Sequence, residues 1–149
     1  MINHESRKRL GKSIMKDEFI EKIEVSVTSQ REAYHWLASS LYPGEEEKIS
    51  ILMEAFLMRE QNGNIQIEEG IILPHIEHEL ITESKIIILY PQKTIIQWNE
   101  AIEQVDLILF VLLSPNETTE KKKKIANFMR CLADERFIQT LKKIRRDKR

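Results

Sequence analysis

The sequence predicts one α/β domain, in which a central sheet is covered by helices. Two observations predict this class. Short apolar runs typical of buried strands alternate along the chain with segments whose apolar residues recur at helical spacing. The 149 residues can enclose one core, and 42% hydrophobic with 32% charged residues is typical of a globular domain. Elements in this order are expected to form an α/β sandwich.

Composition excludes several classes of protein. The net charge is −1, so bulk charge gives no indication of nucleic-acid binding. The single cysteine, Cys131, excludes a disulfide framework, and its helical surroundings predict a packing thiol. No apolar run approaches the length of a membrane span, and the basic N-terminus lacks the apolar core of a signal peptide. We therefore expect a cytoplasmic protein without membrane insertion.

Both ends of the chain are basic. Residues 1–16 contain five arginines and lysines with little apolar content, which predicts an extension outside the domain. No aromatic residue lies between these charges, so the pattern does not favour a nucleic-acid-binding arm. Residues 145–149 are expected to form a second basic tail. The domain itself is expected to occupy residues 17–144.

The first half of the domain is predicted to contain one strand and two helices. Phe19–Val27 alternates apolar and polar residues as a strand does. Ser29 and Glu32 form a capping box, which marks the start of a helix that ends at Tyr42–Gly44. A second helix follows and ends near Arg59. The expected apolar faces are Ala33, Trp36, Leu37 and Leu41 in the first helix, and Ile49, Leu52, Met53, Phe56 and Leu57 in the second.

The second half is predicted to contain the centre of the sheet and two further helices. Ser84–Tyr90 and Val105–Leu113 are apolar throughout much of their length, as central strands buried on both faces are. Thr94–Trp98 is a shorter candidate strand. Helices are expected over Glu117–Asp134 and Glu135–Ile144. Their expected apolar positions are Ile125, Phe128, Met129 and Leu132, then Phe137, Ile138 and Leu141.

The run G-I-I-L-P-H, from Gly70 to His75, is the candidate for a functional site. Gly70 can take backbone angles that other residues avoid, and Ile71–Leu73 is short and apolar like a buried strand. Pro74 fixes its own φ and cannot donate to a sheet, so the strand is expected to end there. His75 would then lie at the strand exit on a stiff backbone, which suits a chemical group. The same local features also fit a loop histidine without a function.

This run resembles the active-site signature of the enzyme IIA domain, fructose/mannitol type, of the bacterial sugar phosphotransferase system. In that family the Pro-His pair follows an Arg-Glu pair upstream, and here Arg59-Glu60 occupy that place. Leu132–Glu135, which reads L-A-D-E, adds to the likeness near the end of the chain. The resemblance extends from about Met15 to Lys143. It implies a mixed sheet of about five strands flanked by helices.

The resemblance also implies a phosphoryl carrier. By analogy, His75 receives a phosphoryl group from a histidine phosphocarrier protein and passes it to a cysteine in the IIB domain of a sugar transporter. Arg59 is implied to hold the phosphoryl oxygens with its planar fork, although it could also be a solvated arginine that suits a helix C-terminus. Backbone N–H groups after His75, at a helix N-terminus, would add donors. No metal or organic cofactor is implied.

Three positions depart from the family pattern. Ile72, two residues before the proline, and Ile76, directly after the histidine, stand where small residues are usual. Many members also have a second histidine near the start of the late helix, and the matching position here is Lys121. A lysine can supply positive charge to a phosphoryl group, but it cannot set the tautomer of His75 as a histidine would.

The residues after His75 suggest a surface for partner proteins. Glu77 and Glu79 are expected to steer a basic partner face, with Ile76 as an apolar contact. His75, Glu77 and His78 could also approach a metal ion if this segment were helical. A metal site needs three or four converging ligands, and no others can be named. We therefore predict no metal.

Two alternative functions remain open from the sequence. IIA-like domains also serve as regulatory modules, attached to transcription regulators or standing alone, and the basic ends would fit a piece of a longer chain. The chain could also keep the fold and lack phosphoryl transfer. Sugar choice belongs to the transporter, so no residue here is expected to encode it.

Overall fold

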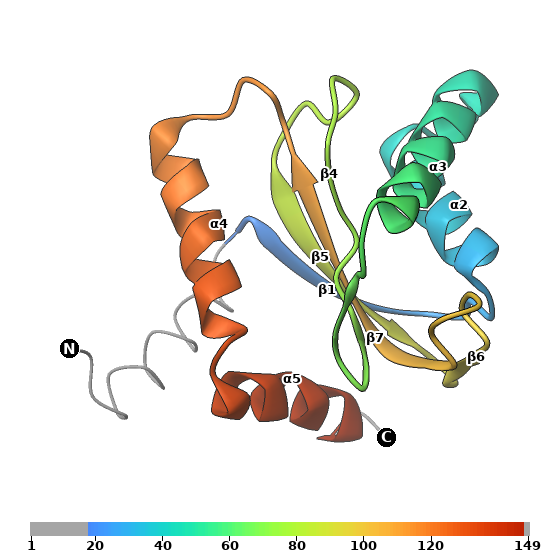
Figure 1. Cartoon of the computed structure of the whole chain (residues 1–149). Helices are drawn as coiled ribbons and strands as arrows, with labels where there is room; N and C mark the ends of the chain where they lie inside the picture. Colours follow the sequence, from blue (N-terminus) through green and yellow to red (C-terminus); the bar gives the residue numbers. More distant parts are fainter. Residues whose placement is uncertain (1–17, 148–149) are drawn as a thin grey trace.

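The computed structural model describes residues 18–147, and their side chains through residue 144. A mixed sheet lies between two layers of helices, which confirms the predicted α/β sandwich (Figure 1). The expected basic extension over residues 1–16 lies outside the described residues. In chain order the elements are β1 (Ile20–Val25), α2 (Gln30–Leu41), α3 (Glu46–Gln61), β2 (Gln66–Glu68), β3 (Gly70–Ile72), β4 (His75–Glu77), β5 (Lys85–Pro91), β6 (Ile95–Ile96), β7 (Gln104–Leu113), α4 (Thr119–Cys131) and α5 (Glu135–Asp147).

Strand β7 is the shared partner at the centre of the sheet. The strand order is β1-β5-β7-β3-β2, and β4 and β6 also pair with β7. Strand β7 is antiparallel to β5 and β6 and parallel to β3 and β4. The middle of β7 is apolar on both faces, with Ile108, Leu109 and Phe110 fully buried. Four strands therefore depend on one ten-residue segment for their hydrogen bonds.

The two faces of the sheet have separate cores. One core joins α2 and α3 to the sheet through side chains such as Leu37, Phe56 and Phe110. The other joins α4 and α5 to the opposite face through side chains such as Phe128 and Leu141. Because successive side chains of a strand point to opposite faces, the continuous apolar runs of β5 and β7 supply both cores.

Local capping signals fix where the helices begin. Ser29 Oγ accepts a hydrogen bond from Glu32 N at 3.1 Å, which confirms the predicted helix start. The Glu32 carboxylate in turn accepts from N and Oγ1 of Thr28. At α4 the cap is Thr118, whose Oγ1 accepts from Lys121 N at 3.2 Å. The predicted start of this helix at Glu117 was therefore two residues too early.

Several element boundaries differ from the prediction. Strands β2 and β4 were not predicted, because three residues are too few to show an alternating pattern. The candidate strand Thr94–Trp98 is reduced to β6. The last helix continues to Asp147 instead of ending at Ile144. Met129 is 36% exposed, so the buried face of α4 is narrower than its apolar pattern suggested.

The two helix layers carry opposite charge. Helix α4 contains five lysines and arginines and one glutamate, and α5 contains five lysines and arginines and two acidic residues. Helix α3 contains four glutamates and two basic residues. Lysines 122–124 are exposed. None of the helices within residues 18–147 is long and apolar enough to cross a membrane.

Candidate functional site

The backbone around β3 and β4 places His75 beside the central strand. Gly70 begins β3 with φ +82°, a conformation that favours glycine. Leu73 N then donates to the Ile65 carbonyl at 2.7 Å, and the Pro74 carbonyl accepts from Val111 N at 3.0 Å. His75 therefore starts β4 in register with Val111 of β7. The ring is partly buried, and its backbone is paired with β7.

Arg59 reaches His75 from the last turn of α3. Its Nε donates to His75 Nε2 at 3.5 Å, the long limit of a hydrogen bond, and its Nη1 donates to the Gly63 carbonyl at 3.1 Å. Two positions that the sequence singled out, 16 residues apart, thus meet in the fold. Within the described residues, Nη2 of Arg59 has no hydrogen-bond partner, which leaves one arm of the guanidinium fork for another acceptor.

This contact specifies the state of the imidazole. Because Arg59 donates to Nε2, that nitrogen must carry a lone pair, and the proton of the neutral ring is on Nδ1. Nδ1 is buried, and no group within residues 18–147 forms a hydrogen bond with it. The Leu73 carbonyl nevertheless acts on the ring and raises its pKa. Burial lowers the pKa of His75, and the neighbouring Arg59 charge lowers it further, while the Leu73 carbonyl opposes both. A neutral ring with a free Nε2 lone pair is therefore favoured near pH 7.

Ile72 and Ile76 point away from the face that His75 occupies in β4. Both are buried in the core beneath α2 and α3, and Ile76 is only 7% exposed. Strand alternation explains this, because adjacent residues of β4 face opposite sides. The expectation that Ile76 contacts a partner is therefore corrected, since its side chain offers little surface. The larger side chains at these two positions are accommodated by core packing.

The segment after His75 is a strand, which corrects two expectations. It pairs with β7, so the predicted helix N-terminus after His75 is absent from the described fold. His78 is also not on a helical turn with His75. Its Nδ1 accepts from Leu80 N at 3.0 Å, and its own N donates to the Leu113 carbonyl at 3.2 Å. Glu77 and Glu79 are exposed. In the described part of the chain, no three His, Cys, Asp or Glu residues are grouped to hold a metal ion.

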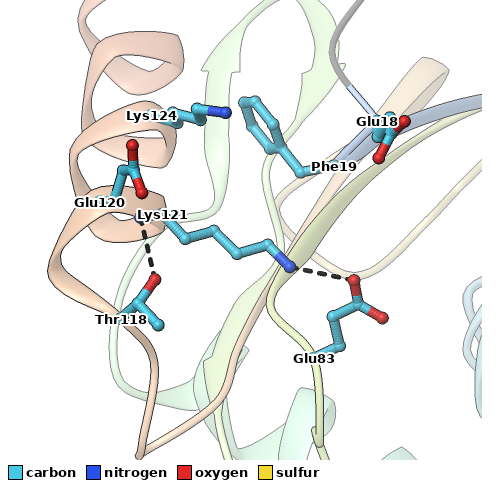
Figure 2. Close-up of a pocket in the computed structure, with 7 residues that line it drawn as sticks. All are labelled: Glu18, Phe19, Glu83, Thr118, Glu120, Lys121 and Lys124. Atoms are coloured by element: carbon cyan, nitrogen blue, oxygen red, sulfur yellow. Dashed lines mark hydrogen bonds and ion pairs between the residues drawn. The ribbon is translucent and has the colours of Figure 1, made fainter.

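Within the described residues, no hydrogen bond or ion pair joins Lys121 to Arg59 or His75. The Nζ of Lys121 forms an ion pair with Glu83 at 3.1 Å, as Figure 2 shows. It belongs to α4, which packs on the face of the sheet opposite to that of Ile76. The residues that share its surface pocket of about 400 Å³ are Glu18, Phe19, Glu83, Thr118, Glu120 and Lys124.

A carboxylate next to Arg59 was noted in the sequence but given no role. Glu60 accepts hydrogen bonds from four side chains, which belong to α2 and to the loop after β6. A glutamate in the last turn of a helix opposes the helix dipole, and this was the available signal that its position needs another explanation. The four donors, which come from distant parts of the chain, are Gln30, Tyr34, Trp98 and Asn99.

Comparison with known proteins identifies the family. The family model described as "Phosphoenolpyruvate-dependent sugar phosphotransferase system, EIIA 2" matches residues 13–149. Among solved structures, the chain is similar to the nitrogen regulatory protein IIA-Ntr from Neisseria meningitidis, with a TM-score of 0.61 and 16% identity, covering 83% of this chain and 84% of that one. It is also similar to IIA mannitol from Escherichia coli, with a TM-score of 0.47 and 19% identity, covering 74% and 79%. A search of curated proteins returned no significant match.

The family match spans nearly the whole chain and includes both Arg59 and His75. The IIA-Ntr structure independently supports the fold. The chain therefore belongs to the EIIA type 2 family of the phosphoenolpyruvate-dependent sugar phosphotransferase system.

Proposed function

We propose that this protein is a phosphoryl carrier that accepts a phosphoryl group on Nε2 of His75. The observation that carries the proposal is the meeting of Arg59 Nε and His75 Nε2 at 3.5 Å. An arginine this close favours the neutral imidazole before transfer, and it can bind phosphoryl oxygens afterwards. Family membership supports a donor and an acceptor of the phosphotransferase system. We place the protein in the bacterial cytoplasm on the same basis.

The proposed step needs no cofactor. The Nε2 lone pair of His75 attacks the phosphorus of a phosphohistidine on the histidine phosphocarrier protein. The P–N bond of the donor breaks, its electron pair returns to the donor imidazole, and a P–Nε2 bond forms. Arg59 balances the negative charge on the transferring oxygens. Its Nη2 has no hydrogen-bond acceptor among the described residues and can donate to these oxygens. A thiolate of a IIB domain then attacks the phosphorus and releases His75.

A regulatory role is the second candidate. A structural neighbour is named as a nitrogen regulatory protein, although 16% identity establishes the fold alone. The ion pair of Lys121 with Glu83 also favours a regulatory role. Lys121 stands at the position of the family's second histidine, and its charge is paired with Glu83 rather than with the phosphoryl site. In this role His75 either receives the phosphoryl group as a signal or is not used, and the output is binding to another protein. A transporter component instead delivers the group to a IIB cysteine.

Intact mass measurement after incubation with phosphoenolpyruvate, the first enzyme of the system and its histidine carrier tests the proposal. We expect one acid-labile phosphate on the wild type, none on His75→Ala, and normal labelling of His35→Ala, which changes an exposed histidine on α2. Addition of IIB domains should remove the phosphate if the protein serves a transporter. Labelling of folded His75→Ala, or no labelling of wild type by a carrier active on another IIA protein, would overturn the proposal.

A further inference from the structure

The carboxylate of Glu60 lies where three separate segments meet. Gln30 Nε2 donates to Oε1 at 2.9 Å and Asn99 Nδ2 at 2.8 Å, while Trp98 Nε1 is shared between the two oxygens at 3.2 and 3.3 Å. The Tyr34 hydroxyl donates to Oε2. A carboxylate is an acceptor on both oxygens, so it can satisfy four converging donors at once. Glu60 therefore joins the end of α3 to α2 and to the loop after β6.

The surroundings of this carboxylate are rigid. Tyr34 stacks on Phe56 with ring centroids 4.8 Å apart and meets Trp98 edge to face at 5.4 Å. On the loop side, Asn99 Oδ1 accepts from the backbone N of Ala101 and of Ile102. Trp98 N donates to the Ile102 carbonyl at 3.0 Å. Tyr34, Trp98 and Asn99 are thus held in place by their own contacts, and the last turn of α3 is hydrogen-bonded to them through Glu60.

The neighbouring residue is the one that reaches the site. Adjacent residues of a helix point about 100° apart, so Glu60 can face its four donors while Arg59 faces His75. Within the described residues, Arg59 has only the long contact to His75 and one bond to the Gly63 carbonyl to hold its guanidinium. The rotation of the last helical turn about its axis consequently decides where the guanidinium lies. The hydrogen bonds of Glu60 tie that turn to α2 and to the loop after β6.

We propose that Glu60 is a positioning residue for phosphoryl transfer, which holds Arg59 in register with His75 by locking the end of α3 to Tyr34, Trp98 and Asn99. The inference rests on the proposed function for its effect on transfer, while its effect on the geometry of the site is independent of transfer. Arg59 touches the reacting group, and Glu60 acts only through Arg59. The Arg59-Glu60 pair thus combines a phosphoryl ligand and its anchor in adjacent positions.

Two conservative variants test this role. Glu60→Gln keeps the shape and removes the charge and one acceptor, and Tyr34→Phe removes only the hydroxyl donor. We expect both to slow phosphoryl transfer by roughly tenfold per folded molecule, as loss of a charged hydrogen bond would. Glu54→Gln, an exposed glutamate on the same helix, is the matched control and should transfer at the wild-type rate. In an Arg59→Ala background neither variant should slow transfer further, because the positioned group is already absent.

The pKa of His75, followed by NMR titration, separates positioning from a simple charge effect. Removal of a negative charge by Glu60→Gln would by itself lower the pKa of a nearby histidine. Displacement of Arg59 from the ring would raise it, and Tyr34→Phe should raise it in the same direction. A rise in both variants supports the inference even if the wild type accepts no phosphate. An unchanged or lower pKa in folded Tyr34→Phe, or equal slowing in the presence and absence of Arg59, would overturn it.

Discussion

At the scale of single residues, the site depends on one imidazole whose protonation is set by its surroundings. His75 is neutral near pH 7 because burial and Arg59 both disfavour the charged ring. A lowered pKa in the fold means that the unfolded chain binds the proton more readily. The stabilising contribution of the neutral ring is therefore present above the ordinary pKa and is lost as the pH falls below it. Phosphoryl acceptance should likewise persist below the pH at which an unperturbed histidine is half protonated.

Arg59→Ala should raise the pKa of His75 and also slow phosphoryl acceptance. The pKa rises because the Arg59 charge no longer opposes protonation, and the rate falls because the phosphoryl oxygens lose their cation. NMR titration of the imidazole checks the first effect, and mass spectrometry over time checks the second. Arg31→Ala, an exposed arginine on α2, should alter neither. A His75 pKa that falls or stays constant in Arg59→Ala would contradict the assigned contact.

Glu117→Gln should reduce the loss in the free energy of unfolding that accompanies a fall in pH from 5 to 2. Glu117 accepts hydrogen bonds from Ser84 and from Thr118 N, chiefly the Ser84 side chain, and these lower the pKa of its carboxyl to about 2. The ordinary value is 4.5, so its stabilising contribution is present above pH 4.5 and is lost as the pH falls towards 2. Urea denaturation between pH 5 and pH 2, at roughly half-unit steps, measures this loss. In Glu100→Gln, at an exposed position, the free energy of unfolding should depend on pH as in the wild type. The same pH dependence in Glu117→Gln would refute the assignment.

At the scale of elements, β3 and its glycine lead the chain to His75, the proposed phosphoryl acceptor. Gly70 has φ +82°, and a Cβ built on it would lie 2.7 Å from Asp106 Oδ2. Gly70→Ala therefore combines backbone strain with a steric clash and should destabilise the fold by about 2 kcal/mol or more. Gly44 has φ +76° with no atom within 4 Å of an added Cβ, so Gly44→Ala should cost the strain alone, about 1–2 kcal/mol. Urea denaturation of the two variants should rank them in this order, and equal losses would show that the Asp106 contact is easily relieved.

The elements also show why sequence patterns predicted part of the site. Long apolar runs and capping residues identified β5, β7 and α2 because each feature is local. Strand β4 is three residues long and was invisible to periodicity, so a helical turn was expected after His75. The Glu60 network was missed for another reason: its four donors are distant along the chain, and only the fold brings them together. Local features around Pro74 singled out His75 as a candidate, whereas Arg59 and the roles of both residues came from the family resemblance.

At the scale of the whole molecule, charge is divided between the two helix layers. Helices α4 and α5 are basic, whereas Glu77 and Glu79 are exposed on the chain that follows His75. If a basic partner face docks there, opposite charges should accelerate the encounter at low salt. The rate constant for phosphoryl transfer from the carrier protein should then fall as ionic strength rises from about 50 to 200 mM, since screening shortens the range of attraction.

Replacement of both Glu77 and Glu79 by glutamine should reduce this salt dependence and slow transfer at low salt, with little change at high salt. Stopped-flow or quench-flow kinetics at several salt concentrations measures the effect. Lys122→Glu, at an exposed position of α4, is the control and should not slow transfer. A rate that is unaffected by the double replacement at every salt concentration would remove these two residues from the docking surface.

The position of β7 in the chain has a consequence for how the domain is made. β3, β4, β5 and β6 all hydrogen-bond to β7, yet β7 is the last strand to be synthesised. While the ribosome is still translating the first hundred residues, these strands have no central partner, and the apolar faces of β5 and of α3 cannot be fully covered. The sheet therefore cannot be completed until residue 113 has left the exit tunnel. His75 and Arg59, although already synthesised, come into contact only when that late segment arrives.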